Sequence, residues 1–290
     1  MMKKVILVSH YQGIAPQALR NVPVHSPSIF AIKQGRKIMS WHEESLHIGG
    51  GDWLVAAAAS QLTFINEPHH QQFSSVQVSF LQPPSQELMD EIEVGYSKGN
   101  RKENKHRGNK EAGKPGAALP SAYHGFSQAQ SPKLSVNSKL TFALDQLLAM
   151  QGLDLSTQVQ THYLNGFYRQ LLEAGALDKL FPGDSQLLRE RVSGYLAQNP
   201  GNEHHIERVC QHFSMSKSTL TRHLALEGTS FREVLAEVRM LHGLSLMQQK
   251  NYRQVDLALL CGYQSESRFS QRFRQQFGVT PKHYMKTVRG

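Results

Sequence analysis

A phenylalanine ladder in the stretch GYQSESRFSQRFRQQFGVTP, residues 262–281, constrains the fold of this chain more than any other feature. Phe269, Phe273 and Phe277 recur at every fourth residue, so they lie on one side of a helix. A core helix explains these phenylalanines, but it does not explain the other side, where three arginines and small polar residues surround a single acid. The stretch therefore predicts a helix that packs by its phenylalanines and offers its opposite face to a partner.

The opposite face has the composition of a base-reading surface. Arg and Gln side chains can form paired hydrogen bonds with guanine and adenine edges, and Arg also binds phosphates. The helix N-terminus adds the positive end of the helix dipole. The residues on this face are Gln264, Ser267, Arg268, Gln271, Arg274 and Gln275, with Arg272 on the flank.

A unit of two short helices joined by a tight turn occurs twice in the last third of the chain. The first unit is predicted over 204–212 and 217–227, and the second pairs 255–263 with the phenylalanine helix. A connecting helix over 231–249 would be about 28 Å long, close to the ~34 Å of one duplex turn. The spacing is consistent with one chain that reaches two successive major grooves. Ser218, Thr221 and Arg222 form the polar face of the first unit.

Positive charge is concentrated in two regions. The chain has a net charge of +9, and residues 181–290 hold 15 Lys/Arg against 9 Asp/Glu. Residues 97–116 hold 7 against 2. This asymmetry favours a polyanionic partner such as nucleic acid, although charge alone also fits a basic protein without one.

The first two thirds of the chain have a different pattern. Residues 1–95 predict a small antiparallel sheet or barrel, because short alternating runs are separated by Gly and Pro. Residues 97–133 lose this periodicity and indicate a mobile basic loop or linker. From residue 137 onward, apolar residues at three- and four-residue intervals indicate two amphipathic helices. Asp184 is the candidate cap of the next helix.

Specific motifs in the last third resemble a known family. The second unit contains LA (257–258), GY (262–263), FGVTP (277–281), Ser267, Phe269, Phe273 and Tyr284, and the first contains Ser216, Leu220, Arg222 and the Phe231–Arg239 spacing. On these motifs, residues 204–285 resemble the DNA-binding domain of the AraC/XylS family of bacterial transcription regulators. The departures are Gln254 for an aliphatic residue, Ser214 for a turn glycine and Gly243 for a helix alanine.

The resemblance implies base contacts from the two reading helices and a structural ion pair at Arg239. Implied base readers are Ser218, Thr221, Arg222, Ser267, Arg268 and Gln271. With the cap and flanking residues, the candidate DNA-binding set is Ser216, Lys217, Ser218, Thr221, Arg222, Gln264, Ser267, Arg268, Gln271, Arg272 and Arg274.

The predicted fold class is α+β, with a small cupin-like β domain and following helices, then an all-α domain with two helix-turn-helix units. The resemblance implies that the N-terminal region binds an effector or dimerises. The predicted divisions are a β-rich regulatory domain (1–96), a flexible linker (97–133), a helical pair (134–180) and the DNA-binding domain (184–290).

We expect a cytoplasmic, sequence-specific transcription regulator, an activator, without catalysis, cofactor, metal site or membrane contact. No apolar stretch approaches the length of a membrane span, and the two cysteines are too few for a disulfide framework. Double-stranded DNA is the expected partner, with RNA polymerase, a small-molecule effector and a homodimer as candidates. No effector-binding residue can be named. The stretch EGTSFREVLAEVRM (227–240) has a looser similarity to regulators of virulence or stress genes.

Several alternatives stay open. The stretch HEESLH (42–47) allows a cupin-type metal enzyme with an accessory DNA-binding domain, although it lacks a His-x-His pair. The adjacent His69 and His70 would point to opposite faces of a strand. Residues 137–176 fit either a dimer interface or domain core, and a protein partner could replace the small-molecule effector.

Overall fold

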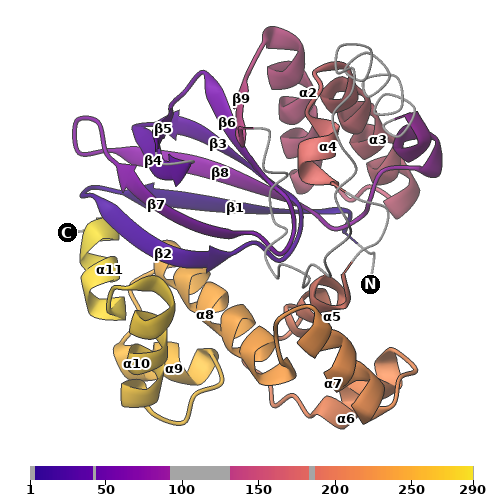
Figure 1. Ribbon diagram of the computed structural model, residues 1–290. Helices are drawn as coiled ribbons and strands as arrows, with labels where there is room; N and C mark the ends of the chain where they lie inside the picture. The colour runs from indigo at the N-terminus through magenta and orange to yellow at the C-terminus, as the bar shows by residue number, and fades with distance from the viewer. Residues whose placement is uncertain (1–3, 42–43, 92–130, 183–186, 290) are drawn as a thin grey trace, which may run out of the picture.

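The computed structural model describes residues 4–41, 44–91, 131–182 and 187–289, and Figure 1 shows a β-rich part resting on a row of helices. The strands of the described chain are β1 (Ile6–Gly13), β2 (Gln17–Pro23), β3 (Ser28–Gln34), β4 (Arg36–Trp41), β5 (Glu44–Ile48), β6 (Asp52–Ala56), β7 (Gln61–Glu67), β8 (Phe73–Phe80) and β9 (Lys133–Ser135). They form two antiparallel sheets, in the orders β1-β8-β3-β6-β9 and β2-β7-β4-β5.

Strand β3 shows why the sheet is enclosed on both sides. Its residues are buried from Ser28 to Ile32, and the pleat turns alternate side chains to opposite faces. Phe30 and Ile32 belong to the core between the sheets, whereas Ile29 and Ala31 belong to the core beneath the following helices.

Those helices cover the outer face of the five-stranded sheet. They are α2 (Ser138–Ala149), the 3₁₀ turn η1 (Met150–Gly152), α3 (Thr157–Glu173) and α4 (Leu177–Leu180). Asn137 and Ser156 cap α2 and α3 with their side-chain oxygens. Phe167 and Tyr168 of α3 pack against Phe80 of the sheet at ring-centroid distances of 5.7 and 5.4 Å.

The C-terminal part is helical. Its helices are α5 (Leu188–Leu196), α6 (Ile206–His212), α7 (Lys217–Leu226), α8 (Phe231–Gln249), α9 (Gln254–Leu260), α10 (Glu266–Phe277) and α11 (Pro281–Arg289). Helices α6 and α7 form the first helix-turn-helix unit, α9 and α10 form the second, and α8 connects them (Figure 1).

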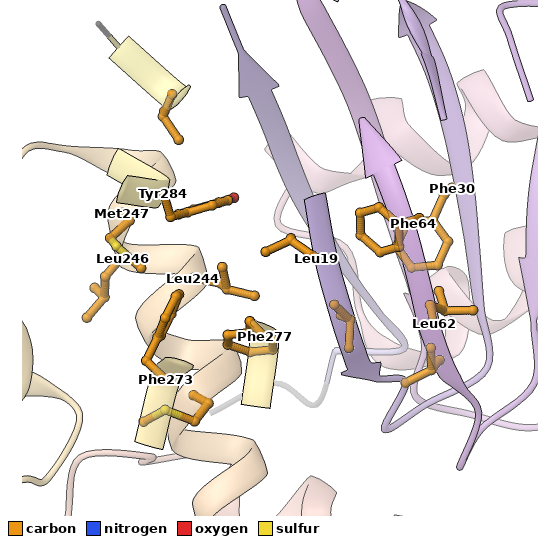
Figure 2. Close-up of a cluster of buried hydrophobic side chains, with 14 of the residues drawn as sticks. Leu19, Phe30, Leu62, Phe64, Leu244, Leu246, Met247, Phe273, Phe277 and Tyr284 are labelled. Carbon is orange, nitrogen blue, oxygen red and sulfur yellow. The ribbon is translucent and has the colours of Figure 1, made fainter. Parts of the chain in front are cut away.

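The two units belong to different hydrophobic cores. The first unit packs with α5 and the N-terminal half of α8 in a core of its own. The core of the second unit is continuous with the interior of the two sheets. In Figure 2, Leu19 of β2 lies between Leu244 and Phe277 on one side and Phe64 on the other. The second unit is therefore part of the hydrophobic core of the β domain.

The predicted fold class is confirmed: a β-rich N-terminal domain with following helices precedes an all-α domain with two helix-turn-helix units. The linker prediction falls almost wholly outside the described residues, as do Asp184, His42 and Glu43. The backbone amides of Leu188 and Arg189 donate to the Glu227 carboxylate at 2.8 and 2.7 Å, so an acid from α7's C-terminus caps α5. The domain boundaries stay a prediction.

Candidate nucleic-acid interface and internal cavity

Helix α10 separates its two faces as the sequence predicts. Phe269, Phe273 and Phe277 are fully buried, and their rings follow one another at centroid distances of 5.8 and 4.7 Å. Ser265 caps the helix and Gly278 ends it with a φ of 78°. The candidate residues Gln264, Ser267, Arg268, Gln271 and Arg274 are exposed.

Helix α7 presents a smaller polar face. Ser216 is its N-cap, and the hydroxyl oxygen accepts a hydrogen bond from the Thr219 amide at 3.1 Å. Ser218, Thr221 and Arg222 are exposed, opposite the fully buried Leu220 and Leu224.

Two candidate residues have other contacts. Lys217 pairs with Glu207 of α6 at 3.0 Å in an exposed ion pair, which is weak enough for a phosphate to replace. Arg272 is half-buried, and its Nε has no hydrogen-bond partner among the described residues. The candidates other than Ser216, Lys217 and Arg272 are exposed, and none of them forms an ion pair among the described residues.

The ion pair implied for Arg239 is not found among the described residues, where backbone oxygens take its place. Its guanidinium donates to the backbone oxygens of Pro200 and Asn202, at 3.3 and 2.9 Å, and lies 5.8 Å from the centroid of the Tyr263 ring. Gly262, with a φ of 75°, passes directly beside it, and a Cβ there would meet the guanidinium at 2.7 Å. Arg239 thus connects α8 with the turn before α6 through hydrogen bonds, and it packs against the turn between α9 and α10.

The β domain contacts the second helix-turn-helix unit on the side opposite the exposed polar face of α10. Gln276 Nε2 donates to the Asn21 oxygen of β2 at 2.7 Å, and the Ile14 amide donates to the Thr287 oxygen of α11 at 2.9 Å. Sequence periodicity identified the helices, but it held no signal for these contacts.

A cavity of about 370 Å³ lies where the sheets meet α5 and α8. This volume falls within the usual range for small-ligand sites. Its lining combines apolar residues such as Leu19, Phe30 and Phe64 with buried polar groups. None of its residues was predicted as a binding residue.

Lys37 is the charged group in the wall of this cavity. It is 2% exposed, its Nζ donates to Asn66 Oδ1 at 2.5 Å, and the same nitrogen lies 3.3 Å from the centroid of the Phe64 ring. Burial holds the pKa of the Lys37 amine well below its ordinary value. Lys37 forms no ion pair with any acid of the described chain. A buried ammonium without an opposite charge is costly, so the site is suited to an anionic ligand group.

The structure does not support the metal-enzyme alternative in the described part of the chain, because no three His, Cys, Asp or Glu residues there lie close enough to hold a metal ion. The expectation that His69 and His70 point to opposite faces of a strand is wrong, because neither residue belongs to one of the named strands. His69 forms an isolated bridge with Gln72, His70 has a φ of 50°, and the two rings contact each other at 4.0 Å. No helix within the described ranges is both long and apolar enough to span a membrane.

These features define a class of protein: a double helix-turn-helix domain carried by a β domain that encloses a cavity. Residues 209–287 match the family described as "Helix-turn-helix domain". The similarity of residues 204–285 to the AraC/XylS type of DNA-binding domain is confirmed by relatives that include regulators of transcription.

Two curated relatives are similar over this domain. The urease operon transcriptional activator of Escherichia coli is 30% identical over 95 residues, which cover 33% of this chain and 32% of that protein. The HTH-type transcriptional regulator GadX of Escherichia coli O6:H1 is 35% identical over 97 residues, 33% of this chain and 35% of that protein. The chain spans about a third of the length of these curated relatives.

Solved structures of ToxT from Vibrio cholerae share the whole fold. One aligns with a TM-score of 0.57 at 15% identity and covers 99% of this chain and 100% of that one. Another, described as unsaturated fatty acid bound wild-type ToxT, aligns with a TM-score of 0.56 at 15% identity, with coverage of 100% and 98%.

Proposed function

We propose that this protein is a sequence-specific DNA-binding transcription regulator, acting as an activator in the cytoplasm without catalysis. The observation that carries the proposal is the division of α10, whose phenylalanines are buried while Ser267, Arg268 and Gln271 remain exposed. A comparable face on α7 lies at the other end of the 19-residue helix α8. Base edges in two successive major grooves would be read by these faces.

Selection of bound sites from fragmented genomic DNA, at about 150 mM salt, tests this proposal. The wild type is compared with a Ser267→Ala/Gln271→Ala variant and with Gln249→Ala, an exposed control on α8. We expect a motif with two half-sites about one helical turn apart, lost or relaxed only in the double variant. Sequence-blind binding by all three proteins, falling steeply with salt, would refute specific recognition.

We further propose that an apolar carboxylic acid in the cavity controls the regulator. The buried Lys37 amine would pair with the carboxylate, and the rings of Phe30 and Phe64 would contact the apolar part. The fatty acid named for one ToxT structure supports this class of ligand. Calorimetric titration with medium-chain fatty acids tests it, and absence of binding by the wild type would contradict it.

A series of hydrogen bonds connects the acid-binding residue Lys37 to helix α8 of the DNA-binding domain. Asn66, which accepts from Lys37, donates through Nδ2 to Gln17 Oε1 at 2.9 Å, and Gln17 Nε2 donates to the Gln12 oxygen at 3.0 Å. The same oxygen accepts from Gln248 Nε2 of α8 at 3.2 Å. Movement of Lys37 towards a carboxylate would therefore change the partners of Asn66 and, through it, the junction between domains.

Homodimerisation and contact with RNA polymerase complete the proposal. An apolar groove of about 820 Å³ lies between α2 and α3, and Phe142 and Tyr163 in its wall are 66% and 45% exposed. A second copy of the chain is the occupant we propose. Sedimentation equilibrium of the wild type and Phe142→Glu would show a dimer and its loss, whereas a monomeric wild type would contradict the dimer.

A further inference from the structure

The cavity has a second polar end, far from Lys37. Two buried polar atoms there have no hydrogen-bond partner among the described residues, His25 Nε2 and Ser193 Oγ. Ser193 is 0% exposed and belongs to α5, whereas His25 lies in the connection between β2 and β3. Both residues line the same cavity as Lys37.

Unpartnered buried polar atoms are costly, and most such atoms in folded proteins find a partner. Here two of them, from segments remote in sequence, line one cavity. Burial, together with the nearby Arg189 guanidinium, lowers the pKa of His25 to about 3, so its imidazole is neutral at physiological pH. A neutral imidazole and a hydroxyl can each donate or accept a hydrogen bond. The pair therefore suits an uncharged polar group rather than a second carboxylate.

The strand register gives the separation of the two ends. Lys37 pairs with Asn66 near one end of β7, and Pro23 pairs with Gln61 at the other. The Val24 amide beyond it donates to the Ser60 oxygen at 2.8 Å, which carries His25 past the end of β7. Five residues of strand span about 17 Å. A ligand that reaches both ends must be elongated.

We propose that the cavity recognises an elongated carboxylic acid with a hydroxyl or keto group at its far end, held by His25 and Ser193. The inference rests on the proposed role of the cavity as an effector site and specifies the class of effector. The acid would sit at Lys37, the chain along the apolar wall and the second polar group at α5. Because Arg189 of α5 forms a buried ion pair with Glu237 of α8 at 2.8 Å, such a ligand would bridge the β domain to the helices that support the first reading unit.

Calorimetric titration of the full chain with dodecanoic acid and with its ω-hydroxy analogue tests the proposal. One buried hydrogen bond contributes about 1 kcal/mol, which corresponds to about fivefold in affinity. We expect the wild type to bind the hydroxy acid at least fivefold more tightly. In a Ser193→Ala/His25→Phe variant the two acids should bind equally, while Lys37→Met should weaken both.

Each outcome has one meaning. Equal binding of the two acids by the wild type would overturn the second polar subsite and leave the acid site intact. A preference for the hydroxy acid that persists in the double variant would also overturn it. If neither acid binds the wild type, the proposed effector role fails as well. Thermal melting by circular dichroism confirms folding, and Ser193→Ala alone, which only removes the hydroxyl, repeats the test if the double variant does not fold.

Discussion

Gln12 and Gln248 join the β domain to helix α8 through two reciprocal hydrogen bonds. The Gln12 amide donates to Gln248 Oε1 at 3.0 Å, and Gln248 Nε2 donates back to the Gln12 oxygen at 3.2 Å. The same Nε2 donates to the Tyr284 hydroxyl oxygen at 2.7 Å. Burial raises the pKa of the Tyr284 hydroxyl above its ordinary value, and the hydrogen bond from Gln248 opposes part of this shift. One amide side chain on α8 thus contacts both the first strand and the last helix.

Replacing Gln248 by alanine should weaken this junction. Gln248 is 7% exposed, so Gln248→Ala removes a partner from the Gln12 amide and leaves the hydroxyl of the buried Tyr284 without its donor. We expect a loss of about 2–3 kcal/mol in the free energy of unfolding, measured by urea denaturation. The neighbouring exposed Gln249→Ala is the matched control and should change stability by less than about 0.5 kcal/mol. Equal stability of the two variants would show that the junction contributes little.

Gln17→Leu should uncouple acid binding from DNA binding. Gln17 links Asn66 to Gln12 and touches neither Lys37 nor DNA, so the variant should bind a fatty acid with wild-type affinity. The acid should then change DNA affinity less than it does in the wild type, as measured by fluorescence anisotropy with and without acid. An unchanged response would exclude this hydrogen-bond route.

Lys37→Met should raise stability while it removes acid binding. Burial lowers the pKa of Lys37 in the folded state, whereas the unfolded state keeps the ordinary value of 10.5. Between these two pKa values the unfolded state binds one proton more than the folded state. The free energy of unfolding of the wild type therefore rises with pH over this range. The methionine variant lacks that dependence and should be about 1–3 kcal/mol more stable at pH 7, by thermal or urea unfolding. Lys33→Met, at an exposed position on β3, is the control and should retain acid binding. A destabilised Lys37→Met would show that its hydrogen bond to Asn66 outweighs the cost of burying the charge.

Ser214→Gly should stabilise the turn of the first unit. Ser214 has a φ of 52°, in the left-handed region that costs a residue with a Cβ about 1–2 kcal/mol. Part of this gain is offset by the greater freedom of glycine in the unfolded chain, so we expect about 0.5–1 kcal/mol of added stability. Ser270→Gly, in the middle of α10, should instead lose about 0.5 kcal/mol. Urea denaturation of both variants checks the opposite signs, and a destabilised Ser214→Gly would mean that the strain is absent.

Glu190→Gln should remove a pH dependence of stability. Burial, with a smaller contribution from the nearby Glu227 carboxylate, raises the pKa of Glu190 to about 7 from its ordinary 4.5. Between pH 4.5 and 7 the folded state binds the proton and the unfolded state does not. The contribution of Glu190 to the free energy of unfolding is therefore fully present below pH 4.5 and is lost as the pH rises to 7.

The glutamine variant should be about 1–2 kcal/mol more stable than the wild type at pH 8, with a smaller gain at pH 5. This range already allows for the partial exposure of the side chain. Glu233→Gln, exposed in the first turn of α8, is the control for general charge effects. If the melting temperatures of the wild type and of Glu190→Gln changed with pH in the same way between pH 5 and 8, the raised pKa of Glu190 would be contradicted.

The helices of the last third were predictable because each has a strong local signature. The phenylalanine ladder fixed the buried face of α10, and the predicted helix over 231–249 has the bounds of α8. The unusual backbone at Ser214 was also predictable, because the related family has a turn glycine at this position. The structure gives Ser214 the positive φ that favours glycine.

The cavity and the domain junction were not predictable, because their residues have no local pattern. Lys37 follows Arg36 and a glycine, a context typical of an exposed turn, and only the register with Asn66 shows that it points inward. Leu19 is an ordinary strand residue until Phe277, far along the chain, packs beside it. For Arg239 the family resemblance implied a structural ion pair, but carbonyl oxygens rather than an acid supply the partners that the structure describes.

The shared core of the second unit has a consequence for how the molecule opens. Units that share a core unfold together, whereas a unit with its own core can open separately. Amide hydrogens of α10 and of the sheet interior should therefore exchange with solvent at similar free energies of opening, and those of α6 and α7 should exchange sooner. If the protein acts as proposed, α10 would keep a fixed position relative to the β domain, whereas α7 could adjust to the spacing of the two DNA half-sites.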